Sequence, residues 1–191
     1  MLRLHTRPED LPPRREGGGR VLPWRAPEAA NGPAVDAVLA GIRPRIQSAE
    51  QEWAEAPSLL DELLRHTLAR RELLVRNSRR FQSLALCGLL LARSHQESAE
   101  APWQGERLAA LALILADALD ADWYGDWALA DARARCWMQI GNARRLAADL
   151  PGAERAFHAA EAHLRQGTGD WEERARLAAL RTRKGPFPKG L

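Results

Sequence analysis

Apolar residues recur three and four positions apart along the chain from residue 34 onwards, and no run alternates apolar and polar residues with a period of two. The first pattern places apolar side chains on one face of an α-helix, whereas the second would indicate a half-buried strand. Alanine and leucine dominate and β-branched residues are few, which leaves little from which to build strands. The sequence therefore predicts an all-α chain.

The apolar faces before residue 120 predict helices over 35–46, 58–77, 78–93 and 108–119, with a polar connection at 94–102. Pro44 is expected to kink or split the first of them, because proline lacks the backbone N–H that a helix interior needs. Ser58 is the expected N-cap of the second. The segment 108–119 is almost continuously apolar, so it is expected to be buried on most sides.

A helical hairpin is predicted over residues 137–164. Its apolar and small residues lie three or four apart on each side of a break: Trp137, Ile140 and Gly141 before it, and Ala153, Phe157, Ala160 and Leu164 after it. The break is made by Asp149, a candidate N-cap, and by Pro151, which a helix tolerates in its first turn. Phe157 is expected to fill the space above Gly141, where two helices can approach closely.

This spacing resembles the tetratricopeptide repeat (TPR), whose unit is a helical hairpin of about 34 residues. The repeat-signature residues that match are Trp137, Ile140, Gly141, Ala153, Phe157 and Ala160. The strings at 71–78, 141–145 and 167–170 are also similar to a group of uncharacterised bacterial repeat proteins. The resemblance implies antiparallel helical hairpins stacked as a short TPR-like right-handed superhelix. Cys87-Gly88 echoes Ile140-Gly141, which suggests a diverged earlier repeat.

The two ends of the chain differ in composition from the helical part. Residues 1–33 concentrate Pro, Gly and Arg without a periodic apolar face, which is typical of a disordered arm. A last helix is expected from Trp171 to about Lys184, where Gly185-Pro186 ends it. The expected organisation is thus an arm at 1–33, a TPR-like domain at 34–184 and a disordered tail at 185–191.

Composition and charge favour a soluble protein of the cytoplasm. The formal net charge of +3 over 191 residues is too small to indicate a polyanionic partner by itself. Cys87 and Cys136 both lie on apolar helical faces, which is typical of buried free thiols in a reducing compartment. The longest apolar run, residues 84–92, is too short to span a bilayer, and the first residues have no secretory signal pattern.

No pattern of catalytic or metal-binding residues stands out. The acidic turn from Asp120 to Asp131 has some positions of a calcium loop, but Tyr124 stands where an oxygen ligand is needed. The five histidines include no pair four apart, and no Gly-rich phosphate loop follows a predicted strand. The expectation is a non-catalytic protein with no cofactor, no metal site and no catalytic residue.

The TPR resemblance implies a function as well as a fold. In that family the second, fifth, ninth and twelfth positions of the repeat face a groove that binds protein segments, and these positions are Arg135, Met138, Asn142 and Arg145 here. Two guanidinium groups, an amide and a thioether would suit an extended acidic segment. The expected function is therefore a protein-protein interaction scaffold that binds a protein or peptide in this groove.

The competing interpretation is a nucleic-acid-associated regulator. Its basis is a C-terminal run of cations with no acid after Glu173, namely Arg174, Arg176, Arg181, Arg183, Lys184 and Lys189. Such a run can contact phosphates, or it can be a solvated helix end whose cations favour the helix dipole. The unpaired last helix also leaves self-association open.

Overall fold

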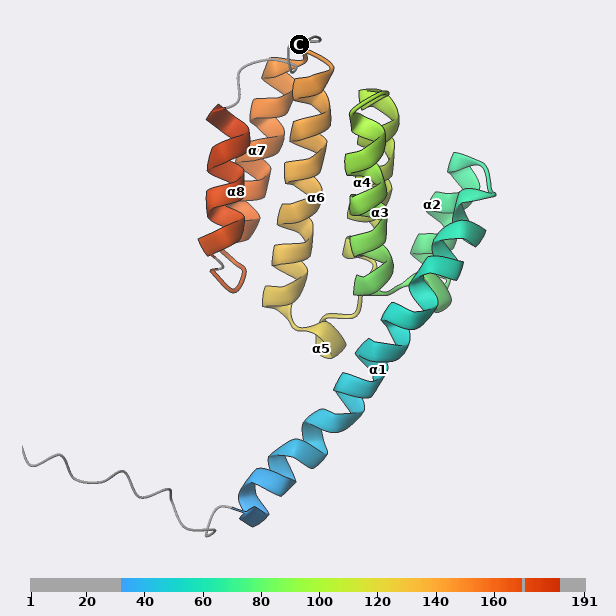
Figure 1. Cartoon of the computed structure of the whole chain (residues 1–191), viewed down its shortest axis with the longest axis vertical. Coiled ribbons are helices and arrows are strands. Elements are labelled where there is room, and N and C mark those ends of the chain that lie inside the picture. The colour runs from blue at the N-terminus through green and yellow to red at the C-terminus, as the bar shows by residue number, and fades with distance from the viewer. Residues whose placement is uncertain (1–31, 170, 183–191) are drawn as a thin grey trace, which may run out of the picture. The chain divides into compact units, whose positions relative to one another are not determined.

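The computed structural model describes residues 32–169 and 171–182. The chain divides into two compact units, residues 1–41 and 42–191, and the described part of the first unit is the start of helix α1. All described elements are helical, and they are α1 (Gly32–Leu64), α2 (Leu68–Asn77), the 3-10 turn η2 (Arg79–Phe81), α3 (Leu84–Ser98), α4 (Pro102–Asp117), α5 (Ala121–Tyr124), α6 (Asp126–Leu146), α7 (Leu150–Leu164) and α8 (Trp171–Thr182). Over these residues the all-α prediction is confirmed (Figure 1).

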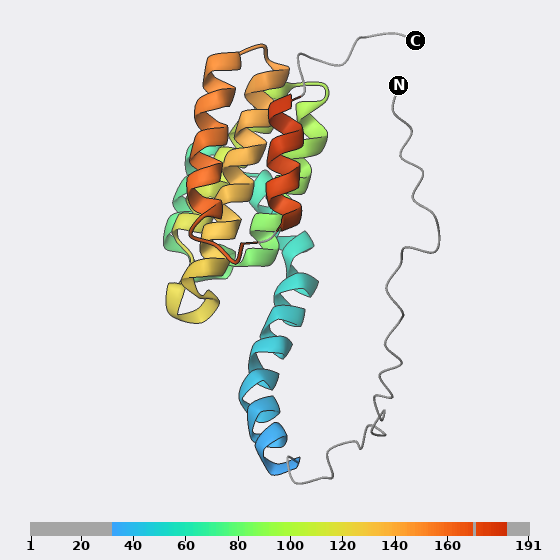
Figure 2. The same ribbon diagram turned by 90° about the vertical axis from the view of Figure 1, so that its left-hand side faces the viewer.

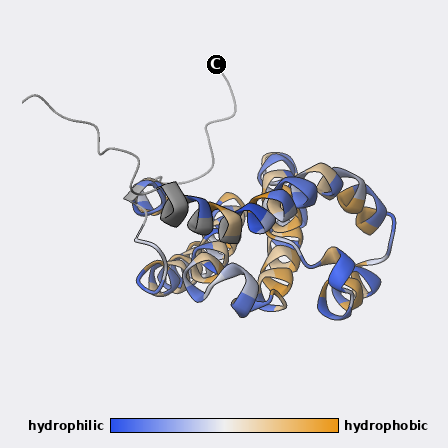
Figure 3. Cartoon of the chain, turned by 90° about the horizontal axis from the view of Figure 1, so that it is seen from below, coloured by the Kyte–Doolittle hydropathy of each residue, from blue (hydrophilic) through white to orange (hydrophobic). Residues whose placement is uncertain are grey.

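The second unit is built on two antiparallel helical hairpins, α3–α4 and α6–α7. Their helices lie side by side with nearly parallel axes, and α8 follows beside α6 and α7 (Figures 1 and 2). Hydrophobic and hydrophilic residues both occur along these helices (Figure 3), and the buried ones are mostly apolar. The largest buried cluster joins α2, α3, α4 and α6 with the end of α1, and a second joins α6, α7 and α8.

The α6–α7 hairpin forms as the sequence predicts. The Asp149 carboxylate caps α7 by accepting a hydrogen bond from the backbone N–H of Gly152 at 2.9 Å. A Cβ atom added to Gly141 would lie 2.6 Å from Cδ1 of Phe157, which shows that the buried ring occupies the space that a side chain would take. Both the cap and the close approach at Gly141 are confirmed.

Helix α1 corrects two expectations. It runs without interruption through Pro44 and through Ser58, which lies inside the helix and donates its hydroxyl to the carbonyl of Glu55 at 2.8 Å. The helix persists because Ala56, Leu59 and Leu63 continue one buried face, and tertiary burial outweighs local propensity. The break instead follows Leu64.

The expected helix start at Ser78 and the expected connection at 94–102 are also corrected. Ser78 precedes the 3-10 turn, and α3 begins after Ser83, whose hydroxyl accepts from the N–H of Leu86. Helix α3 then continues to Ser98 because two of its polar residues, Ser94 and Ser98, are buried and bonded: Ser94 Oγ donates to the carbonyl of Gly105 at 2.6 Å, and Ser98 Oγ donates to the carbonyl of Ser94 at 2.7 Å. The polar run therefore forms part of a tight helix-helix contact.

The suggested equivalence of Cys87-Gly88 and Ile140-Gly141 fails at the glycine. A Cβ atom on Gly88 would meet Trp53 Cη2 at an ordinary 3.5 Å, so no close helix approach depends on this position. In the α3–α4 hairpin that role belongs to Gly105, whose added Cβ would lie 2.8 Å from the carbonyl oxygen of Ser94. The close approach is thus made at a glycine of the second helix in α3–α4, and at a glycine of the first helix in α6–α7.

The expectations for the chain ends fall largely outside the described residues. The proposed arm at 1–33 is described only at Gly32 and Pro33, which begin α1, and the proposed tail at 185–191 is not described. Helix α8 is described to Thr182, two residues before its expected end near Lys184.

Candidate functional site

A groove of about 850 Å³ lies along α3, α6 and α8. The residues that line it are Trp53 of α1, Leu84, Cys87, Gly88, Leu91, Ala92, His95 and Gln96 of α3, Ala128, Asp131, Ala132, Arg135, Met138 and Gln139 of α6, Thr168, and Glu173, Arg176 and Leu180 of α8. We call this the α3–α6–α8 groove. Its helices are the first members of the two hairpins and the helix that follows them in the chain.

Helix α6 supplies the middle wall. Asp131, Arg135, Met138 and Gln139 lie three and four positions apart, so their side chains project from one face of the helix. Cys136 and Ile140 project elsewhere and are buried among the hydrophobic residues. On the groove side only Arg135 is exposed, while Asp131, Met138 and Gln139 are buried, so α6 contributes mainly buried side chains to the lining.

An ion pair joins α6 to α8 across the groove. Arg135 Nε lies 3.0 Å from Glu173 Oε1. The second carboxylate oxygen, Glu173 Oε2, is buried, and no hydrogen-bond donor reaches it among the residues that the structure describes. The Glu173 side chain is only 14% exposed. A buried carboxylate oxygen without a donor is costly, so a donor that enters the groove would be favoured if the Glu173 side chain shifts to expose this atom.

The turn between α7 and α8 is fixed to the same wall. Asp131 accepts hydrogen bonds from the Thr168 hydroxyl at 2.6 Å and from the Thr168 N–H at 3.2 Å. Gly167 lies so close to Asp131 that an added Cβ would overlap the carboxylate. This contact positions the start of α8, and with it Glu173, opposite α6.

The groove is balanced in charge. Its lining includes two guanidinium groups, Arg135 and Arg176, and two carboxylates, Asp131 and Glu173. The α3 side adds mainly apolar or small surface from Leu84, Leu91 and Ala92, together with Trp53 of α1. The arrangement can bury apolar side chains along α3 and exchange hydrogen bonds along α6 and α8.

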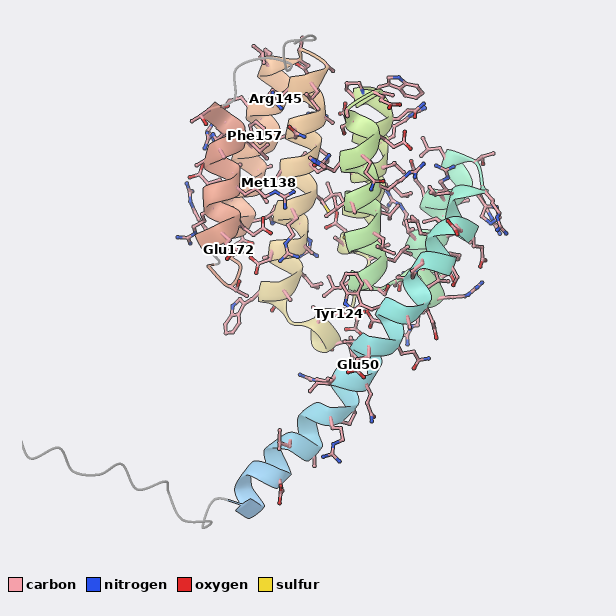
Figure 4. All side chains as sticks on the ribbon, in the orientation of Figure 1. Glu50, Tyr124, Met138, Arg145, Phe157 and Glu172 are labelled. Carbon is pink, nitrogen blue, oxygen red and sulfur yellow. The ribbon has the colours of Figure 1, made fainter. Side chains whose placement is uncertain are left out.

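The structure separates the four residues predicted to bind a partner. Arg135 and Met138 line the groove, although Met138 is itself only 2% exposed, whereas Asn142 and Arg145, each 4% exposed, lie nearer the C-terminal end of α6 and do not line it. Figure 4 shows Met138 and Arg145 at different heights along α6. Arg145 Nη2 donates to Asn142 Oδ1 at 2.9 Å. Two of the four residues thus line this groove, and their assignment to a partner-binding surface stays a prediction.

Several groove residues were not singled out from the sequence. In the sequence Glu173 stands three residues after Asp170, which is the spacing of a capping box at the start of a helix. This spacing gives no indication that Glu173 lines a groove. The α3 residues were not recognised as a wall because the TPR spacing is absent from that hairpin. The repeat of apolar and small residues at Leu84, Gly88 and Leu91 was the available signal.

The basic C-terminal run does not form one described surface. Arg181 contacts Glu154 at 2.7 Å and Glu161 at 3.2 Å, whereas Arg176 lines the groove. Arg183, Lys184 and Lys189 lie outside the described residues. At least one cation of the run therefore has a structural role in holding α8 on α7.

The two cysteines are free and buried, as their apolar positions predict. Their Sγ atoms lie 4.0 Å apart, and the contact with Cys87 together with burial raises the pKa of Cys136 well above its usual value. The Cys136 thiol is therefore protonated at neutral pH, and both cysteine side chains pack as small apolar groups. No set of three or more metal-ligating side chains converges within the described residues.

Comparison of the sequence with family models and with curated proteins, and of the fold with solved structures, found no match. Among the described helices none combines the length and the apolar character required to cross a bilayer. Any assignment of function therefore depends on the groove itself.

Proposed function

We propose that this chain is a non-catalytic, TPR-like interaction module that binds an extended protein segment in the α3–α6–α8 groove. The observation that carries the proposal is Glu173 Oε2, a buried acceptor without a described donor, in a groove long enough to touch three helices. An extended segment presents a backbone N–H at every second residue on each side. It can therefore satisfy the carboxylate while its side chains pack along the helices.

The local hairpin features support the TPR-like part of the proposal. The seam at Gly141 and Phe157 matches the repeat pattern, and the groove is lined by the first helices of consecutive hairpins. In stacked helical repeats that wall is the usual binding surface. Fold alone supplies only a prior, so the chemistry of the groove has to identify the ligand.

The charge balance changes the kind of segment that fits. The sequence suggested an acidic ligand, but Arg135 already contacts Glu173 and the lining carries as many carboxylates as guanidinium groups. Arg145 is buried and lies outside the lining. We therefore propose a segment of low net charge, with apolar side chains toward Leu84 and Leu91 and a hydrogen-bond donor toward Glu173.

The test is selection of peptides from a displayed random library on the full chain, followed by affinity measurement on two matched variants. Ala92→Trp places an indole in the groove from an exposed position of α3, and Ala179→Trp places one on an exposed position of α8 that does not line it. Selected peptides should bind Ala92→Trp at least about ten-fold more weakly and Ala179→Trp within about two-fold. Equal affinity for both variants across the selected peptides would remove the groove from the proposal.

A further inference from the structure

A second hollow lies on residues that the α3–α6–α8 groove does not use. It has a volume of about 350 Å³ and is lined by Leu64, Leu68, Arg71, Arg93, Glu97, Trp103, Gln104, Arg107, Leu108 and Leu111. We call it the α2–α4 pocket, since most of these residues belong to α2, α3 and α4. It shares no lining residue with the groove.

The floor of the α2–α4 pocket is apolar. Leu108 and Leu111 are buried in the main hydrophobic cluster, and Leu64 and Leu68 are half-buried. At the rim Trp103 is 56% exposed, with the Arg107 guanidinium 5.5 Å from the centre of its ring. An exposed indole stacked with arginine over a leucine floor has the composition of the residues that dominate protein interfaces.

The pocket has an excess of positive charge. Of its three arginines, Arg93 pairs with Glu97 at 2.8 Å. Arg71 donates to the backbone carbonyls of Leu64 and His66. Neither Arg71 nor Arg107 has a carboxylate partner among the described residues. In this respect the pocket differs from the groove, where the charges balance.

We propose that the α2–α4 pocket is a docking site for an acidic protein segment that carries a large apolar side chain. The apolar side chain packs on the leucine floor beside Trp103, and flanking carboxylates accept hydrogen bonds from Arg107 and from the outer nitrogens of Arg71. Charge complementarity selects the acidic flanks, and the indole excludes water from the contact. A polyphosphate without an apolar group would leave the leucine floor exposed to water.

The site is independent of the proposed groove, and a second peptide selection can separate the two. The library is displayed as a central pair of large apolar residues with randomised flanks, and it is selected on the full chain. The selected peptides are then measured by fluorescence anisotropy on Trp103→Ala, Arg107→Glu and the groove variant Ala92→Trp. Trp127→Ala, at an indole 71% exposed, and Arg155→Glu, at an exposed position of α7, are the matched controls.

One class of selected peptides should have a net negative flank. It should lose at least about ten-fold in affinity on Trp103→Ala and on Arg107→Glu and change less than about two-fold on the two controls and on Ala92→Trp. Its affinity should also fall as salt increases. Unchanged far-UV circular dichroism would show that these surface variants keep their helices.

The proposal is overturned if no selected class depends on Trp103 and Arg107, or if the dependent class has neutral or basic flanks. It is also overturned if a single-stranded oligonucleotide binds more tightly than every acidic peptide and loses affinity on the same two variants, because the pocket would then serve phosphates. Loss of binding only on Ala92→Trp would support the groove and refute this pocket.

Discussion

Replacing Gly141 by alanine should destabilise the protein, although the same change at a helix interior ordinarily stabilises it. The added Cβ would lie 2.6 Å from Phe157 Cδ1 and closer still to Cε1. Phe157 is only 2% exposed and packs within the α6–α7–α8 cluster. Its ring therefore has no free space into which it can rotate, and α6 and α7 must separate.

The net effect follows from two opposing terms. Alanine gains about 1 kcal/mol over glycine in a helix interior, and forcing extra volume into a packed core costs about 1–3 kcal/mol. The upper part of that range applies because the obstructing atoms belong to a buried ring. Gly141→Ala should thus lower the free energy of unfolding by about 1–2 kcal/mol, which corresponds to a fall of about 2–8 °C in Tm at this chain length.

Gly88→Ala provides the matched control, because its Cβ would make only an ordinary contact at 3.5 Å with Trp53. It should raise the free energy of unfolding by about 0.5–1 kcal/mol. Urea denaturation followed by circular dichroism measures both variants. The reasoning is refuted if the two changes have the same sign. A second test measures the effect of Phe157→Leu on the free energy of unfolding, once in the wild type and once in Gly141→Ala. The reasoning is also refuted if the loss is the same in both backgrounds, because the smaller side chain should relieve the overlap with the alanine.

Two other predictions concern the packing of α6, α7 and α8. Trp137→Ala should lower the free energy of unfolding, measured by urea denaturation, by about 2–3 kcal/mol. This is less than for a fully buried tryptophan, because the Trp137 ring is half-buried against two hydrophobic clusters. A loss below about 1 kcal/mol would contradict this packing. Arg181 lowers the pKa of Glu154 from its ordinary 4.5 by donating a hydrogen bond, so the stability from this pair should be present above that pH and disappear as the pH falls through the lowered pKa. Arg181→Ala should therefore show a smaller acid-induced loss of stability than the wild type, by at most about 1 kcal/mol for an exposed pair, and an equal loss would contradict the assignment.

Local signals in the sequence were enough to predict the α6–α7 hairpin. The Asp149 cap and the pair Gly141 and Phe157 each act over a few residues or one turn between two helices, so spacing alone identifies them. Boundaries elsewhere depended on long-range packing. A proline at position 44 and a serine suited to an N-cap at position 58 both predict a helix boundary, yet α1 continues through both residues. Its later turns carry a buried face at Ala56, Leu59 and Leu63.

The candidate site was predictable only in part for the same reason. Arg135 and Met138 follow from the periodicity of a single helix. The partnership of Arg135 with Glu173 joins two helices separated by the whole of α7, and no spacing rule encodes it. The burial of Arg145 likewise depends on neighbours that the repeat pattern does not specify.

The most direct test of the proposed function is hydrogen-deuterium exchange of the full chain with and without a peptide selected for loss of affinity on Ala92→Trp. Binding in the groove predicts slower exchange in three separate segments, residues 84–96, 128–139 and 173–180, with little change in α7 residues that face away from it. Slower exchange confined to α4 and α7, with none in α3 and α8, would contradict the groove as the binding surface.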